Sequence, residues 1–166
     1  MSEPTPGPSV RRARPEDLAA AGDVTVAAYA QFTLGPADPY VEKLRDAATR
    51  HREAELWVAE LDGAVVGTVT IALEGSPWRE IAERGEGEFR MLAVAPTAQR
   101  RGVGEALMRL VMSRFRDLGA HAVVLSSLAE MTAAHRVYER QGFRRLPERD
   151  WSPFPGVDLL AFRAEL

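Results

Sequence analysis

The sequence contains no cysteine, and this absence excludes several kinds of site at once. Without a thiol, the chain forms no disulfide, offers no thiolate to a metal and has no cysteine nucleophile to carry an acyl group. Histidine is scarce as well: only His51, His121 and His135 occur, and no two of them have the close spacing of a metal-binding motif. We therefore expect no metal cofactor.

Long apolar runs and an excess of positive charge are also missing. No apolar segment approaches the roughly 18 residues that a membrane-spanning helix needs. The formal net charge of −3 and the pI near 5.7 provide no overall field that attracts nucleic acid or an anionic membrane. The N-terminal segment MSEPTPGPSV lacks the basic and apolar regions of a signal peptide. These features predict a cytoplasmic protein that binds neither nucleic acid nor membranes.

The residues that are present fit one globular domain. A chain of 166 residues, of which 46% are hydrophobic and 27% charged, suits a single core. Three prolines and a glycine near the N-terminus predict a disordered lead-in over residues 1–8. No internal repeat or linker divides the remainder, so we expect one domain over residues 9–166.

Hydrophobic periodicity and turn residues predict an α/β protein with the element order βααβββαβαββ. Asp62-Gly63, between two β-rich runs, gives the strongest short-range hairpin signal. The segment PERDWSPFPG is expected to be a loop. The expected helices cover residues 15–30, 40–51, 104–119 and 131–141, and the expected strands cover 9–14, 56–61, 64–73, 89–95, 122–126, 143–146 and 157–163.

The segment QRRGVGEAL, residues 99–107, joins two glycines to the start of an amphipathic helix. Glycine costs backbone entropy, so two of them at a helix start suggest that the backbone must approach a ligand closely. A Walker A loop is excluded because no Gly-Lys-Ser/Thr follows. A dinucleotide fingerprint fits poorly because Leu107 stands where its third glycine belongs. From these residues alone, an ordinary helix start remains open.

The segments on either side help to decide between a ligand-binding turn and an ordinary helix start. FRMLAVAPTAQRRGVGEAL is a strand and a proline followed by Gln-x-x-Gly-x-Gly, and AAHRVYERQGF, about thirty residues later, is a helix closed by Gly-Phe. Together they resemble the GNAT superfamily of N-acetyltransferases. Gln99, Gly102 and Gly104 match the acyl-CoA signature of that family, and Tyr138 matches the tyrosine four residues before its Gly-Phe pair. The matched stretch covers about a third of the chain.

The resemblance implies a GNAT fold, with a central mixed, mostly antiparallel sheet flanked by helices, and an acetyl-CoA cosubstrate. A helix N-terminus offers unpaired N–H groups and partial positive charge to a pyrophosphate. The family also implies a bulged strand whose backbone binds pantetheine. Met131 stands where the family often has a cofactor-binding Asn. The expected cofactor-binding residues are Leu92, Val94, Gln99, Arg100, Arg101, Gly102, Val103, Gly104 and Met131.

Acetyl transfer to an amine needs a proton acceptor and a proton donor. The resemblance makes Tyr138 the general acid for the departing thiolate; packing in the core is its alternative role. Glu88 opens the strand before the turn and is our candidate general base, although exposed glutamates are common at such hairpin ends. A water that relays the proton to the backbone, or to Ser126 or Ser127, is the alternative. His135 is a weaker candidate.

Five aromatic residues are candidate walls of the acceptor site. Those in the proline-rich loop near the C-terminus are the more suggestive, because such a loop has little core of its own. Packing in the core is the alternative role for all five. The partner implied is a small-molecule or peptide amine, and the residues do not separate a lysine, a polyamine, an aminoglycoside or an amino acid. The candidates are Tyr29, Phe32, Tyr40, Trp151 and Phe154.

Three functions remain in competition at this point. The leading one is an N-acetyltransferase in which the amine attacks acetyl-CoA directly in a ternary complex, since no cysteine can hold the acetyl group. The second is a non-catalytic acyl-CoA-binding module of the same fold. The third, an NAD-dependent oxidoreductase, is disfavoured by Leu107. The resemblance also allows a homodimer, which the residues themselves do not indicate.

Overall fold

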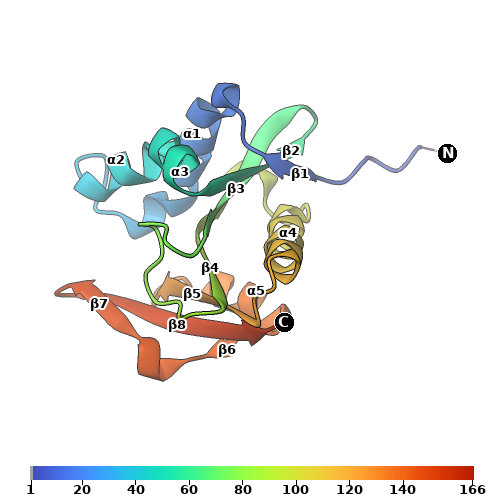
Figure 1. Ribbon diagram of the computed structural model, residues 1–166. Helices are drawn as coiled ribbons and strands as arrows, with labels where there is room; N and C mark the ends of the chain where they lie inside the picture. The colour runs from blue at the N-terminus through green and yellow to red at the C-terminus, as the bar shows by residue number, and fades with distance from the viewer. Residues whose placement is uncertain (1) are drawn as a thin grey trace. The chain divides into compact units, whose positions relative to one another are not determined.

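The computed structural model describes residues 2–166 and separates them into two compact units. The first unit comprises the chain up to Thr70 together with Met91–Leu107. The second comprises Ile71–Arg90 and Met108–Leu166. Residues 2–8 have no regular secondary structure. Figure 1 labels the helices and strands of both units.

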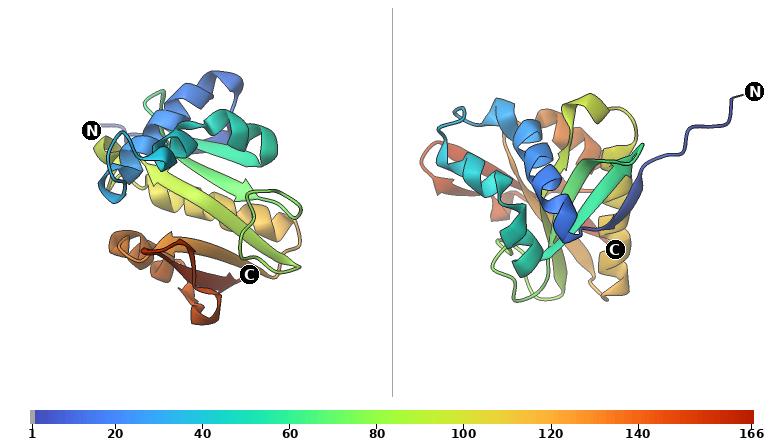
Figure 2. Two further views of the ribbon diagram at one scale, coloured as in Figure 1. Left: turned by 90° about the vertical axis from the view of Figure 1, so that its left-hand side faces the viewer. Right: turned by 90° about the horizontal axis from the view of Figure 1, so that it is seen from above.

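The first unit combines three helices with the N-terminal strands. Strands β1 (Ser9–Arg12) and β2 (Glu55–Leu61) pair antiparallel, and the Asp62-Gly63 turn leads into β3 (Ala64–Ala72). Helix α1 (Leu18–Tyr29) contacts α2 (Pro39–Arg45) and α3 (Ala47–Glu53), and α3 contacts β2 (Figure 2). The expected hairpin at Asp62-Gly63 is therefore confirmed, and both of its turn residues have positive φ.

The single helix expected over residues 40–51 is wrong, because Asp46 divides it into α2 and α3. The backbone of Asp46 leaves the helical region at φ −78° and ψ 68°. Its side chain accepts hydrogen bonds from both the amide and the hydroxyl of Thr49, at 3.0 and 2.6 Å. Aspartate is a preferred N-cap, so this side chain starts a new helix rather than continuing the first.

The second unit is built around an antiparallel pair, β5 (Ala122–Leu128) and β8 (Val157–Glu165). The start of β4 (Glu86–Val94) pairs in parallel with β5 over Glu86–Glu88. Strands β6 (Arg144–Arg145) and β7 (Trp151–Phe154) both pair antiparallel with β8. This unit also holds α5 (Thr132–Arg140) and most of α4 (Val103–Asp117). The mostly antiparallel sheet with flanking helices confirms the expected fold class.

Strand β7 corrects the expected loop at PERDWSPFPG. The three prolines of this segment and the lack of alternating apolar residues argued against a strand, yet Trp151 pairs with Leu159 and Phe154 with Val157. The indole Nε1 of Trp151 donates to the hydroxyl of Ser126 at 3.1 Å. This hydrogen bond joins residues far apart in the sequence, and local patterns cannot reveal it.

Gly87 lets β4 lie directly against α4. A Cβ at this position would lie 2.4 Å from Cδ1 of the buried Phe115. We expect Gly87→Ala to lower the free energy of unfolding by about 1–3 kcal/mol, because the ring must shift to make room. Urea denaturation measures the change. Gly104→Ala is the matched control, since its Cβ would meet only Val94 Cγ2 at 3.8 Å. Equal stability of the two variants would contradict the packing argument.

Candidate functional site

Strand β4 contains one residue in the left-handed region. Met91 has φ 52°, an uncommon value for a residue other than glycine, and in a strand it marks a bulge. The resemblance implied a bulge in this strand, and the left-handed Met91 lies immediately before Leu92. Leu92 and Val94 follow it and are half-buried. The division between the two units also falls here, between Arg90 and Met91.

The segment between β4 and α4 has a tightly specified backbone. Its start is fixed by the amide of Ala95, which donates to the carbonyl of Val66 at 2.8 Å. Further along, Arg100 has φ 64° and Gly102 has φ 79°, so two of three successive residues are left-handed. Residues 99–102 are exposed. An exposed loop with this much conformational constraint is typical of a ligand-binding turn.

Helix α4 begins at this loop with unused amides. The carbonyl of Gly102 accepts the first helical hydrogen bond, from the amide of Ala106 at 3.0 Å. The N–H groups of Val103, Gly104 and Glu105 therefore lie in the first turn, where no preceding helical carbonyl can accept them. A Cβ at Gly102 would meet nothing within 4 Å, so the space beside this turn is open. These features fit a pyrophosphate group.

Tyr138 lies on α5 in a cluster of aromatic rings in the second unit. Its ring centroid is 6.0 Å from Phe89, 6.1 Å from Phe143 and 6.0 Å from Phe162. Burial raises the pKa of its phenol above the usual value. The phenol is therefore protonated at neutral pH and able to donate a hydrogen.

Glu88 is fully buried and uses its two carboxylate oxygens differently. Oε1 accepts three consecutive backbone amides, from Glu80, Ile81 and Ala82, at 2.9 to 3.0 Å. Oε2 is buried too, but no group of residues 2–166 donates to it. An unsatisfied buried oxygen costs free energy, so such a group calls for a functional or solvent explanation.

The loop that wraps Glu88 is also fastened to Arg90. Arg90 Nε lies 2.9 Å from a carboxylate oxygen of Glu80, and its guanidinium carbon lies 5.2 Å from the centroid of the Trp78 ring. All three side chains are largely buried. Glu88 and Arg90, two residues apart on β4, therefore hold one loop at two points.

The family model of the acetyltransferase (GNAT) family matches residues 23–143. The chain belongs to the GNAT acetyltransferase family. A mycothiol acetyltransferase from Cellulomonas flavigena is 35% identical over 121 residues, which cover 64% of this chain and 33% of that protein. Human N-acetylaspartate synthetase is 35% identical over 103 residues, covering 62% and 32%. The chain thus spans about a third of the length of these curated relatives.

Solved structures share the fold of this GNAT chain. A GNAT acetyltransferase from Staphylococcus aureus superposes with a TM-score of 0.75 at 14% identity, covering 96% of this chain and 99% of the other. A Salmonella typhimurium protein described as an acetyltransferase, solved with its cofactor acetyl-CoA, gives a TM-score of 0.68 at 21% identity and covers 97% and 95%. At these identities the likeness establishes the fold alone.

Ser127 and His135, each named from the sequence as a lesser candidate for handling the proton, form a polar pair that the sequence did not predict. His135 Nε2 lies 3.1 Å from both the Ser127 hydroxyl and the carbonyl of Leu128. A carbonyl can only accept, so Nε2 carries the hydrogen and the Ser127 hydroxyl keeps its own hydrogen for another partner. Burial lowers the pKa of His135, which favours the neutral ring. No sequence pattern marks a pair joined between a strand and a helix in this way.

The acceptor candidates of this GNAT chain fall in both units. Tyr29 ends α1, Phe32 follows it and Tyr40 lies in α2, all in the first unit. Trp151 and Phe154 lie on β7 in the second unit, where Phe154 is 66% exposed. The first three candidates therefore belong to one compact unit and the last two to the other.

Met131, the last of the expected cofactor-binding residues, occupies the position before α5. It stands at the N-cap with φ −81° and ψ 56°, and its side chain is half-buried. Its side chain makes no capping hydrogen bond. A methionine lacks the oxygen with which an Asn could cap the helix, so the first-turn amides of α5 have no side-chain acceptor from this residue.

Glu86 is a second buried acid that sequence reasoning passed over. Arg149 Nη1 lies 2.5 Å from its Oε1, Arg163 Nε lies 3.1 Å from its Oε2, and the amide of Glu83 also donates to it. Burial by itself would raise the pKa of Glu86, but these hydrogen bonds outweigh burial and lower it to about 2. Glu86 is therefore ionised and structural.

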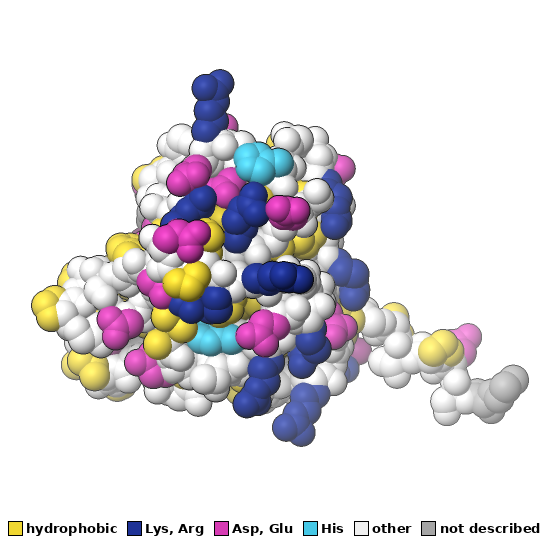
Figure 3. Space-filling model, turned by 90° about the horizontal axis from the view of Figure 1, so that it is seen from below, with side chains coloured by type: hydrophobic (Ala, Val, Ile, Leu, Met, Phe, Trp, Pro, Cys, Tyr) yellow, Lys and Arg dark blue, Asp and Glu magenta, His cyan; other side chains and the backbone are white. Residues whose placement is uncertain are grey.

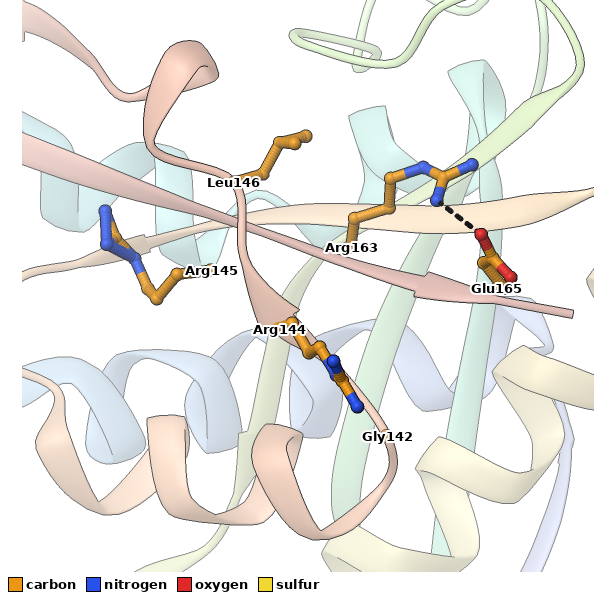
Figure 4. A pocket seen from close by; sticks show the side chains of 6 residues that line it. All are labelled: Gly142, Arg144, Arg145, Leu146, Arg163 and Glu165. Carbon is orange, nitrogen blue, oxygen red and sulfur yellow. Dashed lines mark ion pairs between the residues drawn. The ribbon is translucent and has the colours of Figure 1, made fainter.

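A pocket beside β6 and β8 is lined by arginines (Figure 4). Arg163 also pairs with the exposed Glu165 at 3.5 Å, and Arg145 pairs with Asp150. Acidic side chains likewise accompany the basic ones on the face drawn in Figure 3. The arginines that line the pocket are Arg144, Arg145 and Arg163, and the last two are thus already paired with acidic side chains of the protein.

Among residues 2–166, no group of three or more histidine or acidic side chains is arranged to hold a metal ion. No helix in this described part of the chain combines the length and the hydropathy needed to cross a membrane.

Proposed function

We propose that the protein transfers an acetyl group from acetyl-CoA to a primary amine. The observation that carries the proposal is the loop before α4, where exposed left-handed residues lead into a helix start with unused amides. Family membership supports the same donor, since GNAT acetyltransferases use acetyl-CoA. Gln99, Arg100, Arg101, Gly102, Val103 and Gly104 are proposed to hold its phosphates.

The backbone of β4 after the bulge is proposed to bind the pantetheine arm. A bulge frees strand amides from regular pairing, and an extended ligand can hydrogen-bond to them as an added strand would. The amide of Leu92 would then donate to the thioester carbonyl oxygen, and Val94 would bind further along the arm. A donor at that oxygen stabilises the negative charge that develops there during attack.

Acetyl-CoA supplies an activated thioester; the reaction forms a carbon–nitrogen bond and breaks the carbon–sulfur bond. The ammonium of the acceptor must first lose a proton, which we assign to Glu88 Oε2 acting through a water, because that oxygen has no hydrogen-bond partner among residues 2–166. Tyr138 is assigned the role of proton donor. Its protonated phenol donates to the departing thiolate.

The acceptor is proposed to be a small-molecule or peptide amine, and the residues proposed for its recognition are Tyr29, Phe32 and Tyr40 of the first unit and Trp151 and Phe154 of the second. Relatives of this chain are named for different products, mycothiol and N-acetylaspartate, so the family does not choose among acceptors. A screen of amines with acetyl-CoA, read as release of free thiol, identifies the acceptor.

Titration calorimetry with acetyl-CoA, CoA and NAD tests the donor directly. We expect the folded protein to bind acetyl-CoA and CoA but not NAD. Absence of acetyl-CoA binding would refute the acetyltransferase proposal and leave residues 99–107 as an ordinary helix start.

Gly104→Asp separates the stability of α4 from its ligand binding. A carboxylate in the first turn of a helix is favourable for the helix dipole, by about 0.3–1 kcal/mol, so the variant should fold at least as well as Gly104→Ala. The same charge repels a pyrophosphate at these amides. We expect the Kd for acetyl-CoA to rise at least about tenfold relative to Gly104→Ala, measured by calorimetry. Equal affinity of the two variants for acetyl-CoA would show that the phosphates do not bind at this loop.

A further inference from the structure

The turn between β2 and β3 carries a charge that its geometry does not require. Asp62 has φ 53° and Gly63 has φ 78°, the pattern of a two-residue hairpin turn. Asn-Gly suits this turn as well as Asp-Gly does, so the backbone leaves the carboxylate unexplained. Its Oδ2 lies 3.3 Å from Nη2 of Arg101, in the loop before α4.

Tight packing within the first unit holds this turn and the loop in register. A Cβ at Gly67 of β3 would lie 2.6 Å from Cγ1 of Val103 and 3.0 Å from Cδ1 of Leu107, so β3 touches the first turn of α4. The hydrogen bond from Ala95 to Val66 fixes the other end of the loop to the same strand. The approach of Asp62 to Arg101 therefore follows from the packed backbone.

The contact is one that a stronger ligand can replace. It joins a single pair of atoms, and the two side chains are 45% and 64% exposed. Arg101 makes no other hydrogen bond or ion pair within residues 2–166. Arginine has five N–H donors in a planar fork that fits a phosphate better than a single contact does. An exposed pair of this kind contributes little by itself.

We propose that Asp62 is a counter-ion that Arg101 exchanges for a phosphate of coenzyme A, so that Asp62 limits the affinity of the loop for the cofactor. This inference rests on the proposed function. Asp62 and the phosphate compete for one guanidinium, and salt weakens both of these exposed contacts. The carboxylate weakens binding and thereby favours release of CoA after transfer.

Calorimetric titration with CoA tests the exchange without knowledge of the acceptor. Asp62→Asn keeps the turn and removes the charge. We expect it to lower the Kd for CoA by about two- to fivefold at low ionic strength, and by less at 0.5 M salt. In an Arg101→Gln background the same substitution should change the Kd much less. Asp23→Asn is the matched control, because Asp23 is an exposed aspartate of the same unit that pairs with Arg45 instead.

The outcomes separate this inference from the function on which it rests. Binding of CoA by the wild type, with unchanged or weaker binding by Asp62→Asn, overturns the exchange alone. Equal tightening in the Arg101→Gln background, or by Asp23→Asn, also overturns it, since the effect would then be one of net charge. Failure of the folded wild type to bind CoA overturns both proposals.

Discussion

Replacing Tyr138 by phenylalanine should lower kcat by about 10²–10³-fold while the Kd for acetyl-CoA changes by less than about threefold. The substitution removes only the hydroxyl, and the ring keeps its contacts with Phe89, Phe143 and Phe162. Stability should therefore be preserved. Thiol release in the presence of an accepted amine gives kcat, and calorimetry gives the Kd.

The pH dependence adds a second test of Tyr138. Because burial raises the pKa of its phenol, the group should remain protonated across the neutral and mildly alkaline range. Loss of activity in that range should therefore not come from this group. Phe143→Leu is the control, since it loosens the aromatic cluster and leaves the hydroxyl in place. Full activity of Tyr138→Phe would contradict the acid role, and acetyl-CoA binding without turnover of any amine by the wild type would favour a non-catalytic module.

Glu86→Gln should lower the free energy of unfolding by about 3 kcal/mol. The carboxylate is buried and satisfies Arg149 and Arg163 together, so its neutralisation leaves two guanidinium groups with an uncharged partner. Urea denaturation at pH 7 measures the loss. Glu165→Gln is the matched control, because Glu165 also pairs with Arg163 but is 84% exposed, and its loss should cost less than about 1 kcal/mol.

The stabilising effect of Glu86 should depend on pH in a defined window. Its pKa falls from an ordinary value of 4.5 to about 2 in the folded protein. The stabilisation is therefore complete above about pH 4.5 and is lost as the pH falls toward 2. The wild type should lose stability more steeply than Glu86→Gln between these values. Parallel curves for the two proteins in this window would show that Glu86 is not the group responsible.

Sequence patterns predicted the parts of the fold that depend on interactions between residues close together in the chain. Asp62-Gly63 forms its hairpin because few residues other than Gly, Asn and Asp tolerate positive φ. Helix α4 follows its apolar periodicity and ends at Asp117, two residues before the expected stop at Gly119. The break at Asp46 was missed because an aspartate inside a helical pattern can either face solvent or cap a new helix. β7 was missed because its evidence, such as the bond from Trp151 to Ser126, lies in tertiary contacts.

The acids of β4 show the limit of sequence reasoning about the site. Glu86 and Glu88 stand two residues apart in EGE and look equivalent as residue types. The structure gives Glu86 two arginines from distant segments, whereas Glu88 receives three amides on one oxygen and none on the other. These long-range contacts have no signature in the strand itself. The loop before α4 was easier to predict as a candidate, because its glycines are required by the conformation of the backbone in the loop itself.

The distance along the chain between Glu86 and its arginines has a consequence for the newly synthesised protein. Glu86 leaves the ribosome 63 residues before Arg149 and 77 before Arg163. Until then it has neither guanidinium, and β4 has no β8 to complete the strand pairing around β5. Closing contacts over so long a separation is slow, so we expect the second unit to acquire its native structure only after Arg163 has been synthesised. A chain that terminates before Arg149 would have neither the counter-ions of Glu86 nor strand β8, and should be a substrate for cellular proteases.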